Sequence, residues 1–429
     1  MSLKEAIRPL VPDWALAGFH RARASVAAYR YGLPSRKLQV FGITGTNGKT
    51  STAFFLHSIL EASRRKTGLA TTVRFNDGNG MIVNKKKMTT IEPFQLQKLL
   101  AKMVKNQAKA AVLEVTSHAL AQHRVSRIAF DTVVFTNLSR EHIGEGIFHH
   151  NMEQYRQMKE RLFAKPHRVS VINADDPAAP SFAQYPATRK VFYSVNKTDV
   201  DLFAADVKTQ KEGMSFKLNW ADKSVKVNLK LAGVFNIENA LAAAGAALGS
   251  NIDLDVIVEG LENLTHVPGR VESIDEGQNF SVMIDYAHSP DALKRLFEAV
   301  KPTVRGRLIH VGGATGNRDK QKRRILGGLA ANFADVVVVT NEDPDNEDPE
   351  KIIDEVVAGV MSGAKKFKQG ETFFRLTNRA EAIQKAIKIA QPDDLVLITG
   401  KGDESSMIVK GKLVPYSDRQ VVTKALKQR

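Results

Sequence analysis

The sequence contains no cysteine among its 429 residues. This absence excludes a disulfide framework, a cysteine-ligated zinc site and a cysteine nucleophile, and it fits the reducing cytoplasm in which we expect the protein to work. No apolar run reaches the roughly 20 residues that a membrane-spanning helix needs. The N-terminal segment also lacks the apolar core of a signal peptide.

Proline and glycine are not enriched either, with 15 and 29 residues, so the composition does not indicate a disordered or collagen-like chain. Hydrophobic residues make up 43% of the sequence. A chain of this length exceeds one ordinary hydrophobic core, so we expect two or three domains.

Basic residues are in excess, since 62 Lys and Arg face 46 Asp and Glu, a net charge of +16. This charge favours a phosphorylated substrate, a nucleic acid or an anionic membrane surface as partner. The densest basic runs are residues 85–87 and 318–324. No nucleic-acid-binding motif surrounds them, so we expect no nucleic-acid partner. The second run follows a predicted strand and a glycine-rich turn, which suits the binding of a small anion.

The first 37 residues are typical of a short basic amphipathic helix. Its apolar side chains include Trp14, Leu16, Phe19 and Val26. Packing against the body of the protein is the first interpretation. Weak association with a membrane surface is the alternative.

Apolar runs typical of buried parallel strands alternate with helical patterns along the chain. The first series predicts strands at 38–44, 110–115, 132–137 and 169–173, and helices at 51–62, 94–105 and 151–163. Residues 201–231 predict a β-hairpin or meander instead, because apolar residues alternate with polar ones between turn signals. An Ala-rich helix is predicted at 236–248.

A second series of strands follows Gly269, at 281–286, 308–311, 336–340 and 395–399. We therefore predict an α/β protein in three parts. They are a short N-terminal helical segment (1–37), a central P-loop ATPase domain with a mostly parallel sheet (38–268) and a C-terminal Rossmann-like domain (269–429).

The most specific local signal is GITGTNGKTS at residues 42–51, between a predicted strand and a predicted helix. Backbone amides of such a loop, together with the helix N-terminus, hold phosphate oxygens. Lys49 would reach the terminal phosphates of ATP, and Thr50 would bind Mg²⁺. Ile43 stands where the general P-loop pattern has glycine, so the match is to the variant TGTNGKT.

This variant loop and several other segments, in the same order, resemble the Mur ligase family. The segments are EVTSH (114–118), TNLSREH (136–142), NADDP (173–177), NIEN (236–239) and DYAHSPD (285–291). GNRDK (316–320) and GKGDE (400–404) are similar to the members that add the third residue of the peptidoglycan stem peptide. The resemblance implies that ATP drives the joining of an amino acid to UDP-N-acetylmuramoyl-dipeptide, or to a similar cell-wall precursor, through an acyl-phosphate.

The resemblance also implies an ATP site between the two domains, completed by domain closure. The implied nucleotide-binding residues are Gly45, Thr46, Asn47, Gly48, Lys49, Thr50, Ser51, Asn236, Asn239, Arg270 and Asp285. Mg²⁺ would screen the two reacting anions. Its implied ligands are Thr50, Glu114, His142 and Lys159, and the last three are implied to be catalytic together with Lys49.

Lys159 falls on the apolar face of the predicted helix at 151–163, together with Met152, Tyr155 and Leu162. A buried ammonium is costly unless it is paired or modified. The residue pattern alone would indicate a lysine that extends its amine to solvent. The resemblance implies that CO₂ carbamoylates this lysine, which turns a cation into a carboxylate-like group.

Small-molecule substrates are implied as the partners. Thr89, Thr90, Ser117 and Arg124 would hold the carboxylate substrate, and Arg318 would bind the α-carboxylate of the amino acid. The chain departs from the family where full-length members carry a uridine-binding domain of about a hundred residues. Only 37 residues precede the predicted P-loop domain. We therefore expect that the uridine nucleotide is held less extensively, that another protein supplies this surface, or that the carboxylate substrate is different.

The acceptor side departs from the family as well. Residues 342–345 are Glu-Asp-Pro-Asp, where the diaminopimelate-adding members have Asp-Asn-Pro-Arg, and Asp403 replaces a His. Gly144 and Glu145 stand where many relatives have an Asp. A pocket of Asp343, Asp345 and Glu404 would repel a distal carboxylate and favour a diamine such as lysine.

Two other functions stay open from the sequence. One is a related ligase of the folylpolyglutamate or poly-amino-acid synthetase type, although the EVTSH and GKGDE segments argue against folate. The other is a P-loop ATPase stimulated by nucleic acid, which the +16 charge suggests and which would bind in a salt-sensitive way.

Overall fold

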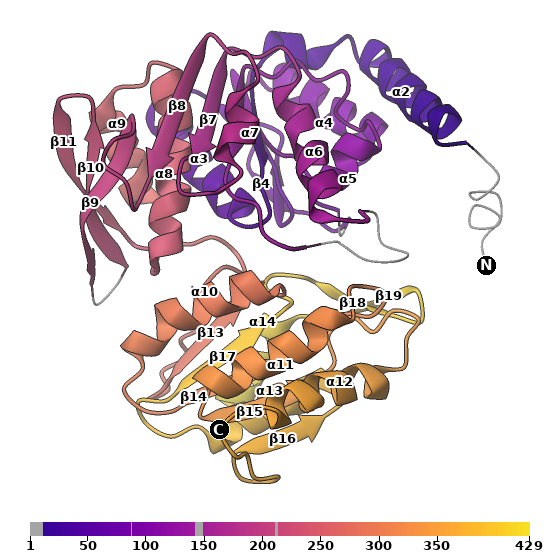
Figure 1. Ribbon diagram of the computed structural model, residues 1–429, viewed down its shortest axis with the longest axis vertical. Coiled ribbons are helices and arrows are strands. Elements are labelled where there is room, and N and C mark those ends of the chain that lie inside the picture. The colour runs from indigo at the N-terminus through magenta and orange to yellow at the C-terminus, as the bar shows by residue number, and fades with distance from the viewer. Residues whose placement is uncertain (1–11, 87, 142–148, 211–212) are drawn as a thin grey trace.

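The computed structural model contains two mainly parallel β-sheets in two lobes, each covered by helices on both faces (Figure 1). It describes residues 12–86, 88–141, 149–210 and 213–429. Within these ranges, no helix is long and apolar enough to cross a membrane. The predicted α/β fold class is confirmed.

The N-terminal helix α2 (Asp13–Arg30) packs on the central lobe against α4 (Pro93–Lys105). Its inner face consists of small side chains, of which Ala24, Ala27 and Ala28 are buried. Trp14 and Phe19 point outward and are 80% and 59% exposed. Packing against the body is therefore confirmed, and membrane-surface association stays a prediction.

The central lobe is built on an eleven-stranded sheet in the order β11-β10-β9-β8-β7-β6-β1-β5-β2-β3-β4. Its middle strand β1 (Gln39–Thr44) pairs in parallel with β5 (Ala110–Glu114) and β6 (Thr132–Phe135). The other strands are β2 (Thr67–Ala70), β3 (Arg74–Asn76), β4 (Met81–Val83), β7 (Val169–Asn173), β8 (Arg189–Ser194), β9 (Leu202–Thr209), β10 (Met214–Trp220) and β11 (Lys223–Leu229). The predicted strands are confirmed to within two residues, and β9–β11 form the predicted meander.

Two helical layers cover this sheet. One face packs against α3 (Lys49–Ala62), α8 (Val234–Gly249) and α9 (Leu254–Asn263), and the other against α4, α5 (Ser117–Ala121), α6 (Met152–Phe163) and α7 (Ala179–Ala183). Small residues bring the helices close. A Cβ on Gly260 would lie 2.4 Å from the Cα of Ile59, so α9 crosses α3 almost backbone to backbone.

The C-terminal lobe has a six-stranded sheet in the order β12-β13-β17-β14-β15-β16. Its central strands are nearly all apolar, as expected for a sheet buried on both faces. The strands are β12 (Glu272–Ser273), β13 (Ser281–Asp285), β14 (Leu308–Gly312), β15 (Val336–Thr340), β16 (Phe373–Leu376) and β17 (Leu395–Thr399). The covering elements are α10 (Pro290–Val300), α11 (Gln321–Phe333), α12 (Pro349–Met361), α13 (Arg379–Ile389), α14 (Asp418–Lys427) and the hairpin β18 (Ser406–Val409)–β19 (Lys412–Pro415).

The loops that follow β1, β5 and β13 meet between the lobes. In α/β proteins, ligands bind outside the carboxyl ends of the strands. Since one sheet spans residues 39–229 and the other 272–399, we keep the division at residue 269 as our proposal for the domain boundary.

Candidate active site

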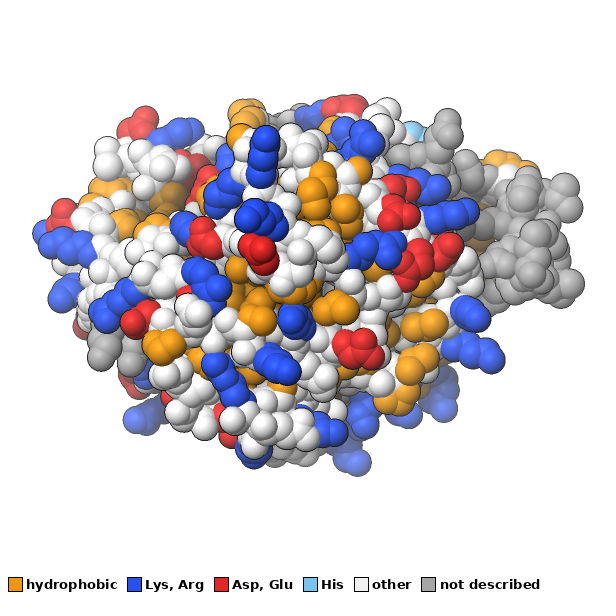
Figure 2. All heavy atoms as spheres, turned by 90° about the horizontal axis from the view of Figure 1, so that it is seen from below, with side chains coloured by type: hydrophobic (Ala, Val, Ile, Leu, Met, Phe, Trp, Pro, Cys, Tyr) orange, Lys and Arg blue, Asp and Glu red, His pale blue; other side chains and the backbone are white. Residues whose placement is uncertain are grey.

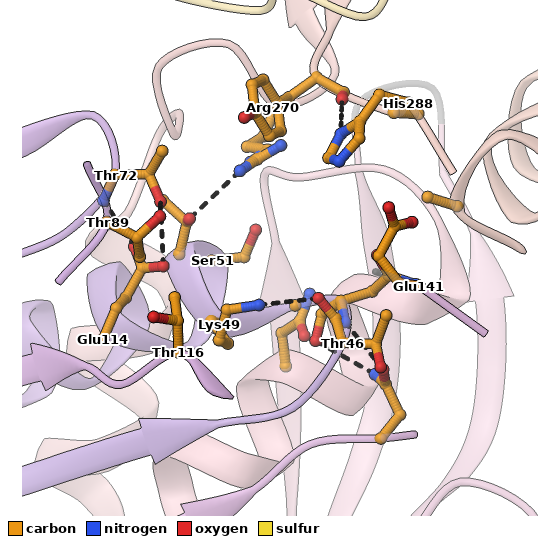
Figure 3. Close-up of a pocket in the computed structure, with 18 of the residues that line it drawn as sticks. Thr46, Lys49, Ser51, Thr72, Thr89, Glu114, Thr116, Glu141, Arg270 and His288 are labelled. Atoms are coloured by element: carbon orange, nitrogen blue, oxygen red, sulfur yellow. Dashed lines mark hydrogen bonds between the residues drawn. The ribbon is translucent and has the colours of Figure 1, made fainter. Parts of the chain in front are cut away.

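A cavity of about 420 Å³ lies between the lobes, and Figure 3 shows side chains from both lobes facing it. Residues that are more than two hundred positions apart in the sequence come together here. The sequence-predicted residues that line it are Thr46, Asn47, Gly48, Lys49, Thr50, Ser51, Thr89, Thr90, Glu114, Arg124, Asn239, Arg270, Asp285 and Arg318.

The phosphate loop joins β1 to α3 and depends on two glycines. Gly45 and Gly48 have φ angles of 149° and 83°. A Cβ would lie 1.9 Å from Thr136 Oγ1 at the first position and 2.2 Å from Asn239 Oδ1 at the second. No side chain caps the N-terminus of α3, so the backbone amides of its first turn are left to bind an anion.

Two lysines converge on the carbonyl of Gly45. Lys49 Nζ donates to this oxygen at 3.0 Å and to Thr46 O at 2.7 Å, and Lys159 Nζ donates to it at 2.7 Å. Burial lowers the pKa of Lys49, and burial followed by the charge of Lys49 lowers the pKa of Lys159 well below its usual value. No ion pair joins either amine to a carboxylate among the described residues, so burial favours the neutral form of both amines.

Lys159 lies beneath the phosphate loop, at the base of the site. It projects inward from α6, on the apolar face that the helical pattern predicted, and is 1% exposed. The alternative of an amine that extends to solvent is therefore wrong. Its Nζ lies 4.3 Å from the centroid of the Tyr155 ring, and Tyr155 OH is 3.3 Å from Thr46 Oγ1. The phosphate loop and α6 are thus fixed to each other.

Glu114 ends β5 directly beside the phosphate-loop strand and is 1% exposed. Its Oε1 accepts from the Thr72 backbone amide at 3.0 Å and its Oε2 from Thr72 Oγ1 at 3.2 Å. Figure 3 shows Thr72, Thr89 and Glu114 together on the wall of the cavity opposite Glu141.

Oxygen atoms suited to Mg²⁺ line this part of the cavity. They include Thr50 Oγ1, the carboxylate of Glu114 and Glu141, whose buried Oε2 has no hydrogen-bond partner among the described residues. Mg²⁺ prefers such hard ligands, so the residues fit the ion. Within the described ranges, no group of three His, Cys, Asp or Glu residues forms a ready metal cluster. His142 lies outside the described residues, and its role stays a prediction.

The C-terminal lobe forms the side of the cavity opposite the phosphate loop. Arg270 Nη2 donates to Thr50 Oγ1 at 3.2 Å, and its guanidinium lies 4.3 Å from the centroid of the Tyr286 ring. Asp285 accepts from the Val271 and Ala287 amides at 2.7 and 2.6 Å. Burial raises the pKa of its carboxyl group.

Polar contacts across the cleft hold the lobes together. Asn47 Nδ2 donates to Asp291 Oδ2 at 2.9 Å, and Arg295 Nη1 donates to Glu238 Oε2 at 3.0 Å. Arg74 of β3 forms an ion pair with Asp403 of the C-terminal lobe.

Two of the residues predicted to bind the nucleotide, Asn236 and Asn239, lie in the first turns of α8. Asn239 lines the cavity, and Asn236 lies behind it, where its Oδ1 accepts from Asn239 Nδ2 at 3.3 Å. Asn236 Nδ2 in turn donates to Ala232 O at 2.7 Å. Asn236 is therefore placed to orient Asn239.

The predicted carboxylate-substrate residues lie on the α5 side of the cavity. Arg124 donates to Thr90 O at 2.7 Å and pairs with Glu92 at 3.3 Å. Ser117 is buried, and its Oγ lies 3.0 Å from His149 Nε2. Burial, then the charge of Lys159, lowers the pKa of His149 to about 4, so this ring is neutral at pH 7.

The predicted acidic pocket is not part of the cavity lining. Buried Lys401 donates to Asp343 Oδ1 at 2.8 Å and to Glu404 Oε2 at 2.5 Å, so two of the three carboxylates already share a cation. Asp345 Oδ2 accepts from Asn317 Nδ2 at 2.9 Å. The sequence-based argument missed Lys401, although its spacing of three from Glu404 was a signal.

The basic run at 318–324 divides between two roles. Arg318 lies on the rim of the cavity. Arg323 is buried and pairs with Glu347 at 2.9 Å and Glu355 at 3.3 Å, so it supports the fold rather than an anion. On the face of the C-terminal lobe seen in Figure 2, basic and acidic side chains are interspersed and form no continuous basic track.

Several cavity residues were not predicted. Glu141, Tyr286 and His288 line the cavity and lie within segments that carried the family resemblance. The position of these segments could therefore have identified them as site residues. Thr72 had no sequence signal, because its place depends on the pairing of β2 with β5.

A phosphate loop and a buried carboxylate of one lobe that face an arginine of the other lobe across a cavity are the arrangement expected of an ATP-dependent ligase. The sequence matches the Mur ligase middle domain over residues 43–247 and the Mur ligase, glutamate ligase domain over residues 269–402. The chain belongs to the Mur ligase family and is an ATP-dependent acid–amino-acid ligase.

Curated relatives support this assignment over most of their length. The UDP-N-acetylmuramoyl-L-alanyl-D-glutamate–2,6-diaminopimelate ligase of Caldanaerobacter subterraneus subsp. tengcongensis is 38% identical over 94% of this chain and 81% of its own. The UDP-N-acetylmuramyl-tripeptide synthetase of Roseiflexus sp. is 38% identical over 97% and 84%.

Solved structures agree with the fold. A UDP-N-acetylmuramoyl-L-alanyl-D-glutamate–2,6-diaminopimelate ligase structure superposes with a TM-score of 0.65 at 30% identity, covering 95% of this chain and 83% of the other. The folylpolyglutamate synthase of Mycobacterium tuberculosis reaches a TM-score of 0.71 at 19% identity, covering 95% of each chain, which shows a shared fold alone.

Proposed function

We propose that the protein joins an amino acid to the free carboxylate of UDP-N-acetylmuramoyl-dipeptide, or of a similar cell-wall precursor, and converts ATP to ADP and phosphate. The observation that carries the proposal is the cavity in which Lys49 and Glu114 of one lobe face Arg270 of the other. The names of the curated relatives support the precursor as substrate. A cytoplasmic location stays a prediction.

The reaction has two balanced steps. A carboxylate oxygen bonds to the γ-phosphorus and ADP leaves. The ammonium of the amino acid then loses one proton to become a nucleophile and bonds to the acyl carbon, phosphate leaves, and the nitrogen loses a second proton to solvent as the amide forms. In the first step, Lys49 would exchange the carbonyls of Gly45 and Thr46 for phosphate oxygens, and Arg270 would add charge from the opposite lobe.

Mg²⁺, when bound, supplies positive charge between two reacting anions. Thr50, Glu114 and His142 are the protein ligands that we propose, with Glu141 as an additional oxygen nearby. Lys159 would contribute as a carbamate. CO₂ reacts with a neutral amine, and the lowered pKa of Lys159 favours that form.

We propose Thr89, Thr90, Ser117 and Arg124 as the wall that holds the carboxylate substrate, and Arg318 as the contact for the α-carboxylate of the amino acid. We propose that the acceptor amino acid is lysine or a similar diamine. Lys401 contacts Asp343 and Glu404 but not Asp345, so this proposal now rests on Asp345. The named relatives add 2,6-diaminopimelate, so the choice needs a direct test.

The test is phosphate release from ATP in a matrix of carboxylates and amino acids. UDP-N-acetylmuramoyl-dipeptide and a folylglutamate are each combined with lysine, ornithine, meso-diaminopimelate or glutamate. We expect release only when the muramoyl peptide and an amine are both present. Release without either substrate, or release stimulated by DNA, would overturn the proposal.

A further inference from the structure

Four basic side chains gather on the α2 side of the central lobe, and we call them the basic cluster: Arg21, Arg127, Arg161 and Lys165. They come from α2, from the turn after α5, and from the end of α6, and Figure 1 shows these three helices on one side of the lobe. Within the described part of the chain, none of the four forms an ion pair with a carboxylate. The nearby acids are already used, since Glu92 pairs with Arg23 and Arg124, and Glu160 with Arg156.

The fold holds these cations together in spite of their repulsion. Arg127 Nε donates to Ser25 Oγ of α2 at 2.9 Å, and Lys165 Nζ donates to Ser126 O at 2.8 Å. Burial, then the charge of Arg127, lowers the pKa of Lys165 to about 8. Like charges kept close without a counter-charge destabilise the protein, and a bound anion would relieve that cost.

His123 lies among these cations and connects them to the cavity. Burial lowers its pKa to about 4, with further contributions from Arg21, Arg161, His20 and Lys165. Its chain neighbours Gln122 and Arg124 both line the cavity. A substrate whose carboxylate lies near Glu114, and whose body runs past Thr90 and Arg124, therefore leads toward the basic cluster.

We propose that the basic cluster binds the diphosphate of a nucleotide-linked carboxylate substrate. The inference rests on the proposed function and specifies how that substrate is held. A diphosphate offers several charged oxygens at the spacing that guanidinium groups recognise with paired hydrogen bonds. The three arginines and the lysine would contact the diphosphate from three separate segments. This arrangement favours a compact ligand with a fixed position.

Binding of UDP tests the proposal directly. Titrations use the full chain with the phosphate loop saturated by a non-hydrolysable ATP analogue. The test variant is Arg21→Glu/Arg161→Glu, since both side chains are exposed. The matched control is Lys223→Glu/Lys388→Glu, which changes net charge equally at exposed positions of β11 and α13.

Wild type and control should bind UDP and inorganic pyrophosphate but not uridine, and added salt should weaken binding. The test variant should bind UDP at least about ten-fold more weakly, because each substitution removes an attraction and adds a repulsion. Equal UDP affinity in all three proteins would overturn the proposal. The proposal would also be overturned if the test variant lost binding to single-stranded DNA or to phosphatidylglycerol vesicles but still bound UDP as wild type does.

Kinetics separate this inference from the proposed function. The test variant should raise KM about ten-fold for UDP-N-acetylmuramoyl-dipeptide, with KM for ATP unchanged and no change for the nucleotide-free muramoyl dipeptide. A KM that rises equally for both carboxylates would overturn the role of the diphosphate. If wild type ligates neither carboxylate, the proposed function fails, and the UDP titration still decides the fate of the basic cluster.

Discussion

Two regions of the molecule treat their charges differently. The first is the cavity lining around the phosphate loop, which we call the ATP wall. The second is the group of Asp343, Asp345, Lys401 and Glu404, which lies outside the cavity lining and which we call the acceptor wall, after its proposed role. On the ATP wall, half-buried Lys49 and buried Lys159 donate to backbone carbonyls, and their pKa values are lowered. On the acceptor side, Lys401 is buried between Asp343 and Glu404, and these acids raise its pKa against the effect of burial. The ATP wall keeps its lysine amines out of ion pairs, whereas the acceptor wall pairs its buried cation with its own acids.

This difference indicates where substitutions should change chemistry and where they should change selectivity or stability. A lysine amine that is hydrogen-bonded only to neutral carbonyls can move to a phosphate oxygen without breaking an ion pair. A buried cation shared by two half-buried acids is costly to separate from them. Substitutions on the ATP wall should therefore change mainly kcat, and substitutions on the acceptor wall should change mainly the selectivity for the amino acid.

The largest effect is expected from Lys49→Ala. Removing the cation that reaches the phosphates should lower kcat by about a thousand-fold or more, by analogy with the loss of one charge-stabilising donor. Lys98→Ala, on the exposed face of α4, is the control. Thermal unfolding should be similar for both proteins, and near wild-type ligation by Lys49→Ala would show that the phosphate-loop assignment is wrong.

Lys159→Ala should come next, with a loss of about a hundred-fold or more that short-chain carboxylates partly restore. Depleting CO₂ should inactivate wild type, and bicarbonate should recover it. Wild type labelled with ¹³C-bicarbonate should give a carbamate carbon signal that Lys159→Ala lacks. A bare amine by mass spectrometry, together with full activity of Lys159→Ala, would rule out the carbamate.

The acceptor wall is tested by the ratio of kcat/KM for L-lysine to that for meso-diaminopimelate. Asp345→Arg should shift this ratio toward diaminopimelate by about ten- to a hundred-fold, since a charge of one sign replaces the other. Asp345 has a φ of 54°, so Asp345→Asn is included because it removes the charge and tolerates this backbone conformation.

Glu371→Arg, on an exposed turn, is the control for Asp345→Arg. Wild type that prefers diaminopimelate would refute lysine-type addition. An unchanged ratio in both Asp345 variants would place this residue away from the substrate.

The smallest effect is expected at the ion pair between Arg74 and Asp403, which joins the two lobes. Arg74→Ala should raise KM for the amino acid a few-fold and leave kcat nearly unchanged, because solvent still screens a pair whose side chains are 20% and 17% exposed, and such a pair contributes about 1 kcal/mol. A double-mutant cycle with Asp403→Ala should give a coupling energy of similar size. Additive effects of the two substitutions would show that the pair does not couple the lobes.

The sequence predicted the ATP wall better than the acceptor wall. The phosphate loop follows from a local pattern, a glycine-rich turn between a strand and a helix. Glu114 came from the resemblance of a segment that begins where a predicted strand ends. The pairing of Lys401 with Asp343 joins residues 58 positions apart and depends on the packing of two strand ends. Short strands such as β3 and β4, of three residues each, also lack a recognisable pattern.

Transfer of oxygen is the most direct test of the account. The substrate carboxylate is labelled with ¹⁸O, and the phosphate released during one turnover is analysed by mass spectrometry. Since an acyl-phosphate leaves its bridging oxygen on phosphorus when the amine attacks carbon, we predict one ¹⁸O atom in each released phosphate. Phosphate without the label, formed at the same rate as the amide, would contradict carboxylate activation by ATP.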